Sequence, residues 1–181
     1  MILGRKFFGR PTLVVACDLL GKYLVRKRGE KVEKFIITEV EAYDGFKDKA
    51  SHASRGKTLR NAPMFGEAGR WYVYFTYGIH YMLNIVTGPK NYPAAVLIRG
   101  VKGINGPGCL TKQLKIDKKF NNKSASLKTS LWIAASTESE RVSLQKAFRS
   151  GNIKIKKTPR VGVAYAGTIW SKKKWRFDIK A

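Results

Sequence analysis

The chain has 181 residues and carries 36 Lys and Arg against 12 Asp and Glu, which gives a formal net charge of +24. Its apolar content of 44% is enough to build a core, so a disordered tail and a small disulfide-stapled peptide are both excluded. Two cysteines without a CxxC pair exclude a four-cysteine metal cluster. No apolar run reaches about 18 residues, and nothing after Met1 reads as a cleavable leader. We therefore expect no membrane partner and a cytoplasmic protein, close to the nucleoid if the source is prokaryotic.

The first third of the chain predicts a helix, two strands and a long loop. Residues 11–20 begin with Pro and space their apolar residues three to four apart, as a short helix does. Residues 22–27 and 34–43 are rich in Val, Ile, Thr and Tyr, which favour strands. Residues 44–69 are rich in Gly, Ser, Lys and Pro, so they predict a loop.

The middle of the chain predicts a β-hairpin and a further strand. Residues 71–75 and 81–86 are aromatic and β-branched, and the residues between them include Gly78, which is free to take a positive φ in a turn. Residues 94–101 form another apolar, β-branched run.

The last third predicts a helix over 106–116, a polar surface excursion over 118–130, and strands over 160–167 and 174–179. Strands outnumber helices and mostly follow one another by short turns. The expected class is therefore α+β, with a mainly antiparallel sheet in a single domain over residues 1–181.

A third of the acids of this basic chain, Glu39, Glu41, Asp44 and Asp48, form an acidic cluster within ten residues. Glu39 and Glu41 stand two apart near the end of a predicted strand and so share a face, and Tyr43 and His52 follow closely. A carboxylate, a phenol and an imidazole can line a pocket in which the carboxylate is a general base, although a solvated edge is the simpler interpretation of an acidic pair. No HxxxH, HxE or EF-hand spacing is present, so we expect no metal and no cofactor.

Aromatic residues are concentrated in the predicted hairpin. Six of the twelve residues in 70–81 are Trp, Tyr or Phe, and a sheet that packs aromatics on both faces accounts for some of them. It does not account for Tyr77, which stands beside Gly78 at the tip. An exposed aromatic at a tip can wedge between stacked bases, and Tyr72 or Tyr74 could be a platform for a base.

Two polar residues interrupt apolar strands. Arg99 ends a strand, where it is either an edge residue or a buried partner that would keep Glu41 ionised. Asn84 stands in the middle of another strand, where it has either a structural hydrogen bond or a role in a pocket. The cations are spread over the whole chain and interleaved with aromatics, a pattern typical of nucleic-acid binding.

Several long motifs in this order resemble the alkyladenine (3-methyladenine, or methylpurine) DNA glycosylases of the single-domain type, which are unrelated to the helix-hairpin-helix glycosylases. The resemblance runs from about Phe7 to Ile179 and weakens over 120–157. It rests on TEVEAYDGFKDKASHASRGKTLRNAPMF, WYVYFTYGIHYMLNIV, AAVLIRG, GPGCLTKQL and RVGVAYAG. The chain departs from the family pattern at Ala164-Tyr165, often Gly-His, at Lys174, often Pro, and in a loop after His52 that is one residue shorter than in some relatives. These departures bear on DNA contacts and substrate breadth.

The resemblance implies a curved antiparallel sheet with a hairpin that enters the DNA minor groove. It also implies a role for each matching residue. Glu41 would be the general base that activates water, and Arg99 the cation that helps to position this water. Tyr43, His52 and Tyr74 would be the aromatic walls around the flipped base, and Asn84 would crowd the exocyclic amino group of guanine at the pocket floor. The backbone carbonyls of Ala50 and Val161 would contact the base or the water. Tyr77 would be the plug that fills the gap in the duplex, and Thr58 and Arg60 would lie in the segment that contacts phosphates.

The partner implied is double-stranded DNA with a damaged base, bound by a monomer that hydrolyses the N-glycosidic bond of alkylated purines such as 3-methyladenine and 7-methylguanine, with hypoxanthine and ethenoadenine as further candidates. Two other functions compete with this one. A non-catalytic nucleic-acid-binding protein would need the charge and the aromatics but not Glu41. A metal-dependent nuclease would use the acidic cluster with a bound cation.

Overall fold

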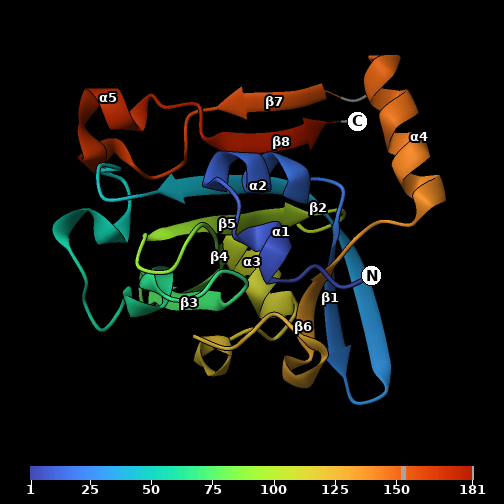
Figure 1. The fold of residues 1–181 in the computed structure, drawn as a ribbon, viewed down its shortest axis with the longest axis horizontal. Helices are drawn as coiled ribbons and strands as arrows, with labels where there is room; N and C mark the ends of the chain where they lie inside the picture. Colours follow the sequence, from blue (N-terminus) through green and yellow to red (C-terminus); the bar gives the residue numbers. More distant parts are fainter. Residues whose placement is uncertain (152–153, 181) are drawn as a thin grey trace.

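The long strand β2 (Lys31–Asp44) is the centre of the fold, because three other strands pair with it. The structure is a computed structural model that describes residues 1–151 and 154–180. The eight strands of this part of the chain form one sheet in the order β3-β4-β5-β2-β1-β6, with β8 paired to both β2 and β7 (Figure 1). All of these pairs are antiparallel. The predicted α+β class with a mainly antiparallel sheet is confirmed.

The remaining strands are β1 (Tyr23–Arg28), β3 (Trp71–Thr76), β4 (His80–Val86), β5 (Ala94–Val101), β6 (Leu131–Ala134), β7 (Lys154–Thr158) and β8 (Arg176–Lys180). The helices are α1 (Arg5–Phe8), α2 (Thr12–Leu19), α3 (Pro107–Gln113), α4 (Glu138–Arg149) and α5 (Gly167–Ser171). Short 3-10 turns are η1 (His52–Arg55), η2 (Ala62–Phe65), η3 (Lys118–Phe120), η4 (Leu127–Thr129) and η5 (Ala164–Ala166). Of the helices in 1–151 and 154–180, none is long and apolar enough to cross a membrane.

Strand β2 changes partners along its length. Its first half pairs with β1, and its second half lies between β5 and β8. The register shifts around Glu39, where a β-bulge separates the two halves and can bend the strand. Beyond the bulge, Glu41 lies opposite Leu97 of β5 and Arg176 of β8, so this carboxylate stands in the interior of the sheet.

The main core lies where α2 packs across β2 and β5, as Figure 1 shows. The face of α2 that carries Val15 and Leu19 is fully buried against apolar strand residues such as Ile37 and Ile98. Two smaller apolar clusters lie apart from this core, and both include Tyr43 at their border. They are built from the loop after β2, from β3 and from the segment before α5, and they form the walls of the site described below.

Most of the predicted elements are confirmed, with ends that differ by up to three residues. The helix predicted over 11–20, the hairpin over 71–86, the strand over 94–101 and the final strand are all present. The helix predicted over 106–116 ends earlier, at Gln113, and Lys115 has a positive φ of 51°.

The strand predicted over 160–167 is wrong. This segment is a loop followed by η5 and the start of α5, with positive φ at Gly162 and Gly167. Strand β7 takes the place beside β8, although its sequence KIKKT has no apolar alternation. An edge strand that is mostly exposed needs no apolar face, which is why the pattern did not reveal it.

The segment 44–69 is irregular as predicted, yet much of it is buried. Asp48, Ala50, Ser51, Asn61 and Met64 each have 3% of their surface exposed or less. Asn61 holds the segment together, because its amide donates to the carbonyl oxygens of residues 52 and 56, each at 2.9 Å. A loop with this much internal structure can position side chains as firmly as a strand.

Ile85→Ala should destabilise the protein by about 2–5 kcal/mol, because Ile85 is fully buried between Trp71 and Val96 of the neighbouring strands and its loss leaves a cavity. The matched control Ile169→Ala removes the same atoms from a side chain that is 72% exposed, and should cost less than about 0.5 kcal/mol. Urea denaturation measures both. Equal losses in the two variants would contradict the assignment of the core.

Candidate active site

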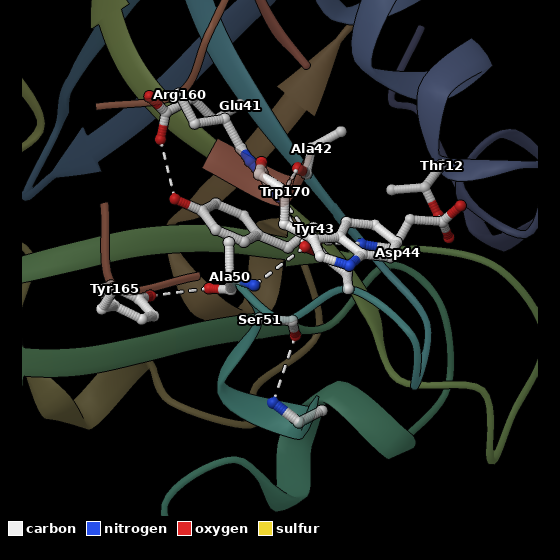
Figure 2. A network of polar contacts seen from close by, with 12 residues as sticks. Thr12, Glu41, Ala42, Tyr43, Asp44, Ala50, Ser51, Arg160, Tyr165 and Trp170 are labelled. Carbon is white, nitrogen blue, oxygen red and sulfur yellow. Dashed lines mark hydrogen bonds and ion pairs between the residues drawn. The ribbon is translucent and has the colours of Figure 1, made fainter. Parts of the chain in front are cut away.

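The carboxylate of Glu41 is the centre of the site, because it is fully buried and yet surrounded by donors. The Val161 backbone N–H donates to Oε1 at 2.8 Å, and the Tyr43 hydroxyl donates to Oε2 at 2.9 Å. Figure 2 shows Tyr43 between Glu41 and Ala50, with its hydroxyl pointing to the carboxylate. Both oxygens are thus held in place, as a group that acts at one fixed point requires.

Arg99 joins Glu39 and Glu41 of β2. Its Nε donates to Glu39 at 2.8 Å, and its Nη1 lies 3.4 Å from Oε1 of Glu41. Glu39 also pairs with Arg176 at 2.7 Å. Arg99 therefore contacts both carboxylates, and Glu39 is shared between Arg99 and Arg176.

Burial raises the pKa of Glu41, and the cation of Arg99, the Val161 N–H and the Tyr43 hydroxyl each oppose that shift. The net direction is upward, so this carboxyl holds its proton more tightly than an ordinary Glu. A raised pKa makes the carboxylate a stronger base, which suits a group that accepts a proton from water near neutral pH.

Two adjoining hollows lie at the site, and Glu41 lines the outer one. The outer one has a volume of about 300 Å³ and is lined by Glu41, Arg99, Tyr77 and Val161 among others. The inner one is about 40 Å³ and lies deeper, against Met64, Tyr72 and Asn84. Both are lined by the same four rings, which belong to Tyr43, His52, Tyr74 and Tyr165. A planar aromatic ligand would fit between such walls.

The inner wall is a cluster of three stacked or edge-packed rings. The His52 ring centroid lies 4.6 Å from that of Tyr74, and the Tyr72 and Tyr74 centroids are 5.1 Å apart. His52 Nδ1 is hydrogen-bonded to the Tyr72 hydroxyl at 2.9 Å. Burial and the nearby cation of Arg60 lower the pKa of His52, so this imidazole is neutral at neutral pH and presents a polarisable face.

Asn84 and Ala50 lie at opposite sides of the inner hollow. The Asn84 amide donates to the Tyr72 carbonyl at 3.0 Å and to the Met82 carbonyl at 3.3 Å, so it has a structural hydrogen bond and lines the pocket at the same time. The Ala50 carbonyl accepts a hydrogen bond from the Tyr165 hydroxyl at 2.9 Å (Figure 2). Tyr165, one of the positions that depart from the family pattern, is therefore a wall of the pocket.

The β3–β4 hairpin carries an exposed aromatic tip. Tyr77 and Gly78 have φ values of 52° and 68°, a pair of left-handed residues that closes the turn. Tyr77 is 81% exposed and the next residue but one, Ile79, is 68% exposed. Tyr77 also lines the outer hollow. A large apolar tip thus projects into solvent beside the pocket mouth.

Thr58 and Arg60 lie on the loop that flanks this hairpin, and both are exposed. Thr58 exchanges hydrogen bonds with Asn61 and so caps the turn that follows. The Arg60 guanidinium lies 5.3 Å from the centroid of Tyr74 and donates to the Phe75 carbonyl at 2.9 Å. The cation is held close to the pocket wall by these two contacts.

The acidic cluster does not converge on one point. Glu39 faces two arginines, Glu41 faces Tyr43 and Val161, Asp44 accepts from the Thr12 hydroxyl at 2.7 Å, and Asp48 pairs with Arg160. Across residues 1–151 and 154–180, no three His, Cys, Asp or Glu side chains are grouped as metal ligands.

Sequence reasoning missed four residues of the site: Met64, Tyr165, Arg160 and the side chain of Asp48 as the partner of Arg160. Tyr72 was only one of two candidate platforms, and it lines the inner hollow. Arg160 stood at the end of a run of cations that is typical of a solvated surface, yet its side chain is fully buried. The only sequence signal for Arg160 was that it precedes Val161, a predicted site residue. Composition does not indicate which cation of such a run has a buried side chain.

The fold and the site combine a buried carboxylate, held by hydrogen-bond donors, with an aromatic pocket and a protruding hairpin on a strongly basic protein. These features are those expected of an enzyme that acts on a base in DNA. The family described as methylpurine-DNA glycosylase (MPG) matches residues 6–104 and 101–181. A protein of Wolbachia sp. subsp. Brugia malayi is 42% identical over 187 residues, covering 98% of this chain and 97% of that protein. Proteins of Legionella pneumophila (strain Lens) and Streptomyces avermitilis are 40% and 39% identical, covering 98% of this chain and 94% and 87% of their own. All three carry the provisional name 3-methyladenine DNA glycosylase.

The chain therefore belongs to the methylpurine-DNA glycosylase family, and it is a DNA N-glycosylase, a hydrolase of DNA repair.

The raised pKa of Glu41 has a consequence for stability. A carboxyl whose folded-state pKa lies above its unfolded value contributes stability below the unfolded pKa, near 4.5, and this contribution is lost as pH rises through the folded pKa. Glu41→Gln removes the titration and keeps an oxygen for the Val161 N–H. The melting temperature of the variant relative to the parent should therefore rise between pH 4 and pH 8. Thermal unfolding at stepped pH measures this, and a difference that is constant with pH would contradict the buried, perturbed carboxyl.

Proposed function

We propose that the protein releases alkylated purines from duplex DNA by hydrolysis of the N-glycosidic bond, with Glu41 as the general base. The observation that carries the proposal is the position of this carboxylate, fully buried at the border of an aromatic pocket and held by a backbone N–H, a phenol and Arg99. One carboxylate beside a positioned water is the minimum apparatus for breaking a glycosidic bond. Release of the base leaves an abasic site.

In the proposed reaction Glu41 takes a proton from a water molecule as the water oxygen bonds to C1′ of the sugar. The bond from C1′ to the purine nitrogen breaks, and its electron pair goes to the base. A cationic base such as 3-methyladenine or 7-methylguanine leaves as a neutral molecule, so it needs no separate proton donor. Arg99 and the backbone of Val161 flank Glu41 at the outer hollow, which suits them to hold the water.

Recognition of the base is proposed to depend on the rings around the pocket. Tyr43, His52 and Tyr74 present electron-rich faces, and such faces attract a positively charged purine more strongly than a normal one. His52 adds to this preference because its lowered pKa keeps it uncharged. Asn84 and the Ala50 carbonyl, at the inner hollow, would read the exocyclic groups of the base. Hypoxanthine and ethenoadenine are uncharged and would depend on these polar contacts instead.

The base must leave the helix before it can enter this pocket, which costs a few kcal/mol and least for a damaged pair. We propose that Tyr77 enters the duplex and fills the gap, because it is an exposed aromatic on a hairpin tip beside the pocket mouth. Thr58 and Arg60, on the loop that flanks the hairpin, are proposed to contact the phosphates. The net charge of +24 supplies the general attraction to DNA.

We further propose that residues 1–181 act as one catalytic unit and as a monomer, and that base release is the whole reaction, with no strand cleavage by the protein. The relatives named above carry the name of a 3-methyladenine DNA glycosylase over nearly their full length, which supports this assignment.

Glu41→Gln should bind lesion-containing duplex as the parent does and release base at least ~10²-fold more slowly, because the water then lacks its proton acceptor. Single-turnover base release from methylated DNA measures the rate, and the same reaction in EDTA separates hydrolysis by Glu41 from a metal-dependent nuclease. Near-normal rates in the variant would refute the assignment of the base. A parent protein that binds DNA but releases no base from any damaged purine would instead favour the non-catalytic binder.

Tyr77→Ser should change the free energy of unfolding by less than about 0.5 kcal/mol, because the ring is exposed and makes its contacts only with opened DNA. A core aromatic would cost roughly 3–5 kcal/mol on truncation. The variant should nevertheless flip fewer bases, which the fluorescence of ethenoadenine in a duplex reports. The control Val32→Ser removes an exposed apolar side chain from β2 near the β1–β2 turn and should leave flipping unchanged. Unfolding of Tyr77→Ser, or normal flipping by it, would show that the residue is structural.

A further inference from the structure

Two loops from distant parts of the chain contribute residues to the pocket lining. Residues 45–51 follow β2, and residues 159–163 follow β7. Neither loop is part of the sheet, so its position depends on contacts other than strand pairing. The first carries Ala50, whose carbonyl lies at the inner hollow, and the second carries Val161, whose N–H donates to Glu41.

A buried ion pair joins these loops. Arg160 Nη1 lies 2.6 Å from Asp48 Oδ2, and Arg160 Nη2 lies 2.8 Å from Asp48 Oδ1. Both side chains are fully buried. The geometry is bidentate, which fixes the relative orientation of the two groups as well as their distance.

The same two side chains attach both loops to the sheet. Arg160 Nη1 also donates to the Ala42 carbonyl of β2 at 2.8 Å, and its guanidinium lies 4.8 Å from the ring centroid of Tyr43. Asp48 accepts the backbone N–H of Asp44 at 3.2 Å and that of Ala50 at 3.1 Å. Ala42 is the neighbour of Glu41 in β2, so the pair is anchored one residue away from the carboxylate.

We propose that Asp48 and Arg160 are positioning residues for the glycosylase reaction: their ion pair holds the Val161 N–H against Glu41 and holds the Ala50 side of the pocket in register with it. The inference rests on the proposed role of Glu41 as the base. Neither residue touches the reacting atoms. The second link between the two segments, from the Tyr165 hydroxyl to the Ala50 carbonyl, lies at the pocket surface and is the weaker constraint because Tyr165 is 68% exposed.

Loss of the ion pair should shift the pKa of Glu41 in one direction, and this shift can be measured. The Val161 N–H and the Arg160 cation both favour the ionised form of Glu41, so their displacement raises the pKa of Glu41 further. A general base must be ionised to act. The acidic limb of the rate profile should therefore move to higher pH. The charged and titratable groups that face Glu41 are Arg99 from β5, Tyr43 and Glu39 from β2, Tyr74 from β3, and Arg160 and Tyr165 from the C-terminal segment.

The test compares single changes with a neutral double change. Asp48→Asn and Arg160→Lys each break the bidentate contact, and either leaves a poorly paired buried charge that can prevent folding. Asp48→Asn combined with Arg160→Met leaves no unpaired charge, and replacement of a buried ion pair by uncharged groups is often tolerated. The control Leu131→Ala removes a fully buried side chain from β6, at the opposite end of the sheet order from the hairpin.

Single-turnover base release from methylated DNA is measured from pH 4.5 to pH 9 for each variant, together with its melting temperature. The folded double variant should bind undamaged duplex normally, release base at least ~10-fold more slowly at pH 7, and show an acidic limb moved up by about half a pH unit or more. Leu131→Ala should lose melting temperature without moving the limb.

Three results would overturn the proposal: a double variant with the parent's rate and limb, a loss of rate with no change in the limb, or a double variant without a cooperative unfolding transition. Each would make the pair a structural element only. The outcome for Glu41→Gln separates this failure from failure of the proposed function. If Glu41→Gln keeps its base release, the base is misassigned and the positioning role falls with it. If Glu41→Gln is inactive and the pair variants are normal, only the positioning role is refuted.

Discussion

A carboxylate buried in the interior of a sheet is costly, and the architecture around Glu41 can be understood as the means of keeping it there. Burial of an ionised carboxyl without partners would raise its pKa until it stayed neutral. A backbone N–H, a phenol and Arg99 oppose that effect, and each comes from a different part of the chain. The sheet brings β2 and β5 together, while the segment after β7 supplies the N–H of Val161. The site therefore exists only when all of these parts are assembled.

The regular elements and the irregular segments of the chain contribute different parts of the site. The sheet and α2 supply the core and fix the strand that carries Glu41 and Tyr43. The irregular segment 44–69 and the residues around Val161 supply further walls beside those from the strands, and their lining residues Ala50, Met64 and Val163 are buried, whereas Val161 itself is half exposed. Positive charge is spread along the whole chain, which suits attraction to a polyanion, whereas the proposed discrimination between bases rests on a few rings in one hollow.

Local patterns identified much of the site before any fold was known. Tyr77 stood beside a glycine between two aromatic strands, so a short window of sequence was enough to single it out, whereas the choice of Glu41 over Glu39 came from the family resemblance. Arg160 and Tyr165 could not be found in this way. Their segment alternates apolar residues with small ones and reads as a strand, but two glycines with positive φ turn it into a loop. Which of its side chains turn inward is decided by the partner at Asp48, more than one hundred residues earlier.

The sequence by itself determined the α+β class, the central strands, the hairpin and the strongly basic character of the protein. Each of these depends on periodicity, turn residues or charge, which can be seen in short stretches of sequence. Strand β7 and the loop at 159–163 were decided by tertiary structure, since an exposed edge strand needs no apolar pattern and a loop takes its shape from the groups it meets. The same holds for the electrostatics of the site. A carboxyl has an ordinary pKa in the unfolded chain, and only its burial between β5 and β8, partly opposed by Arg99 and the Val161 N–H, raises the pKa of Glu41.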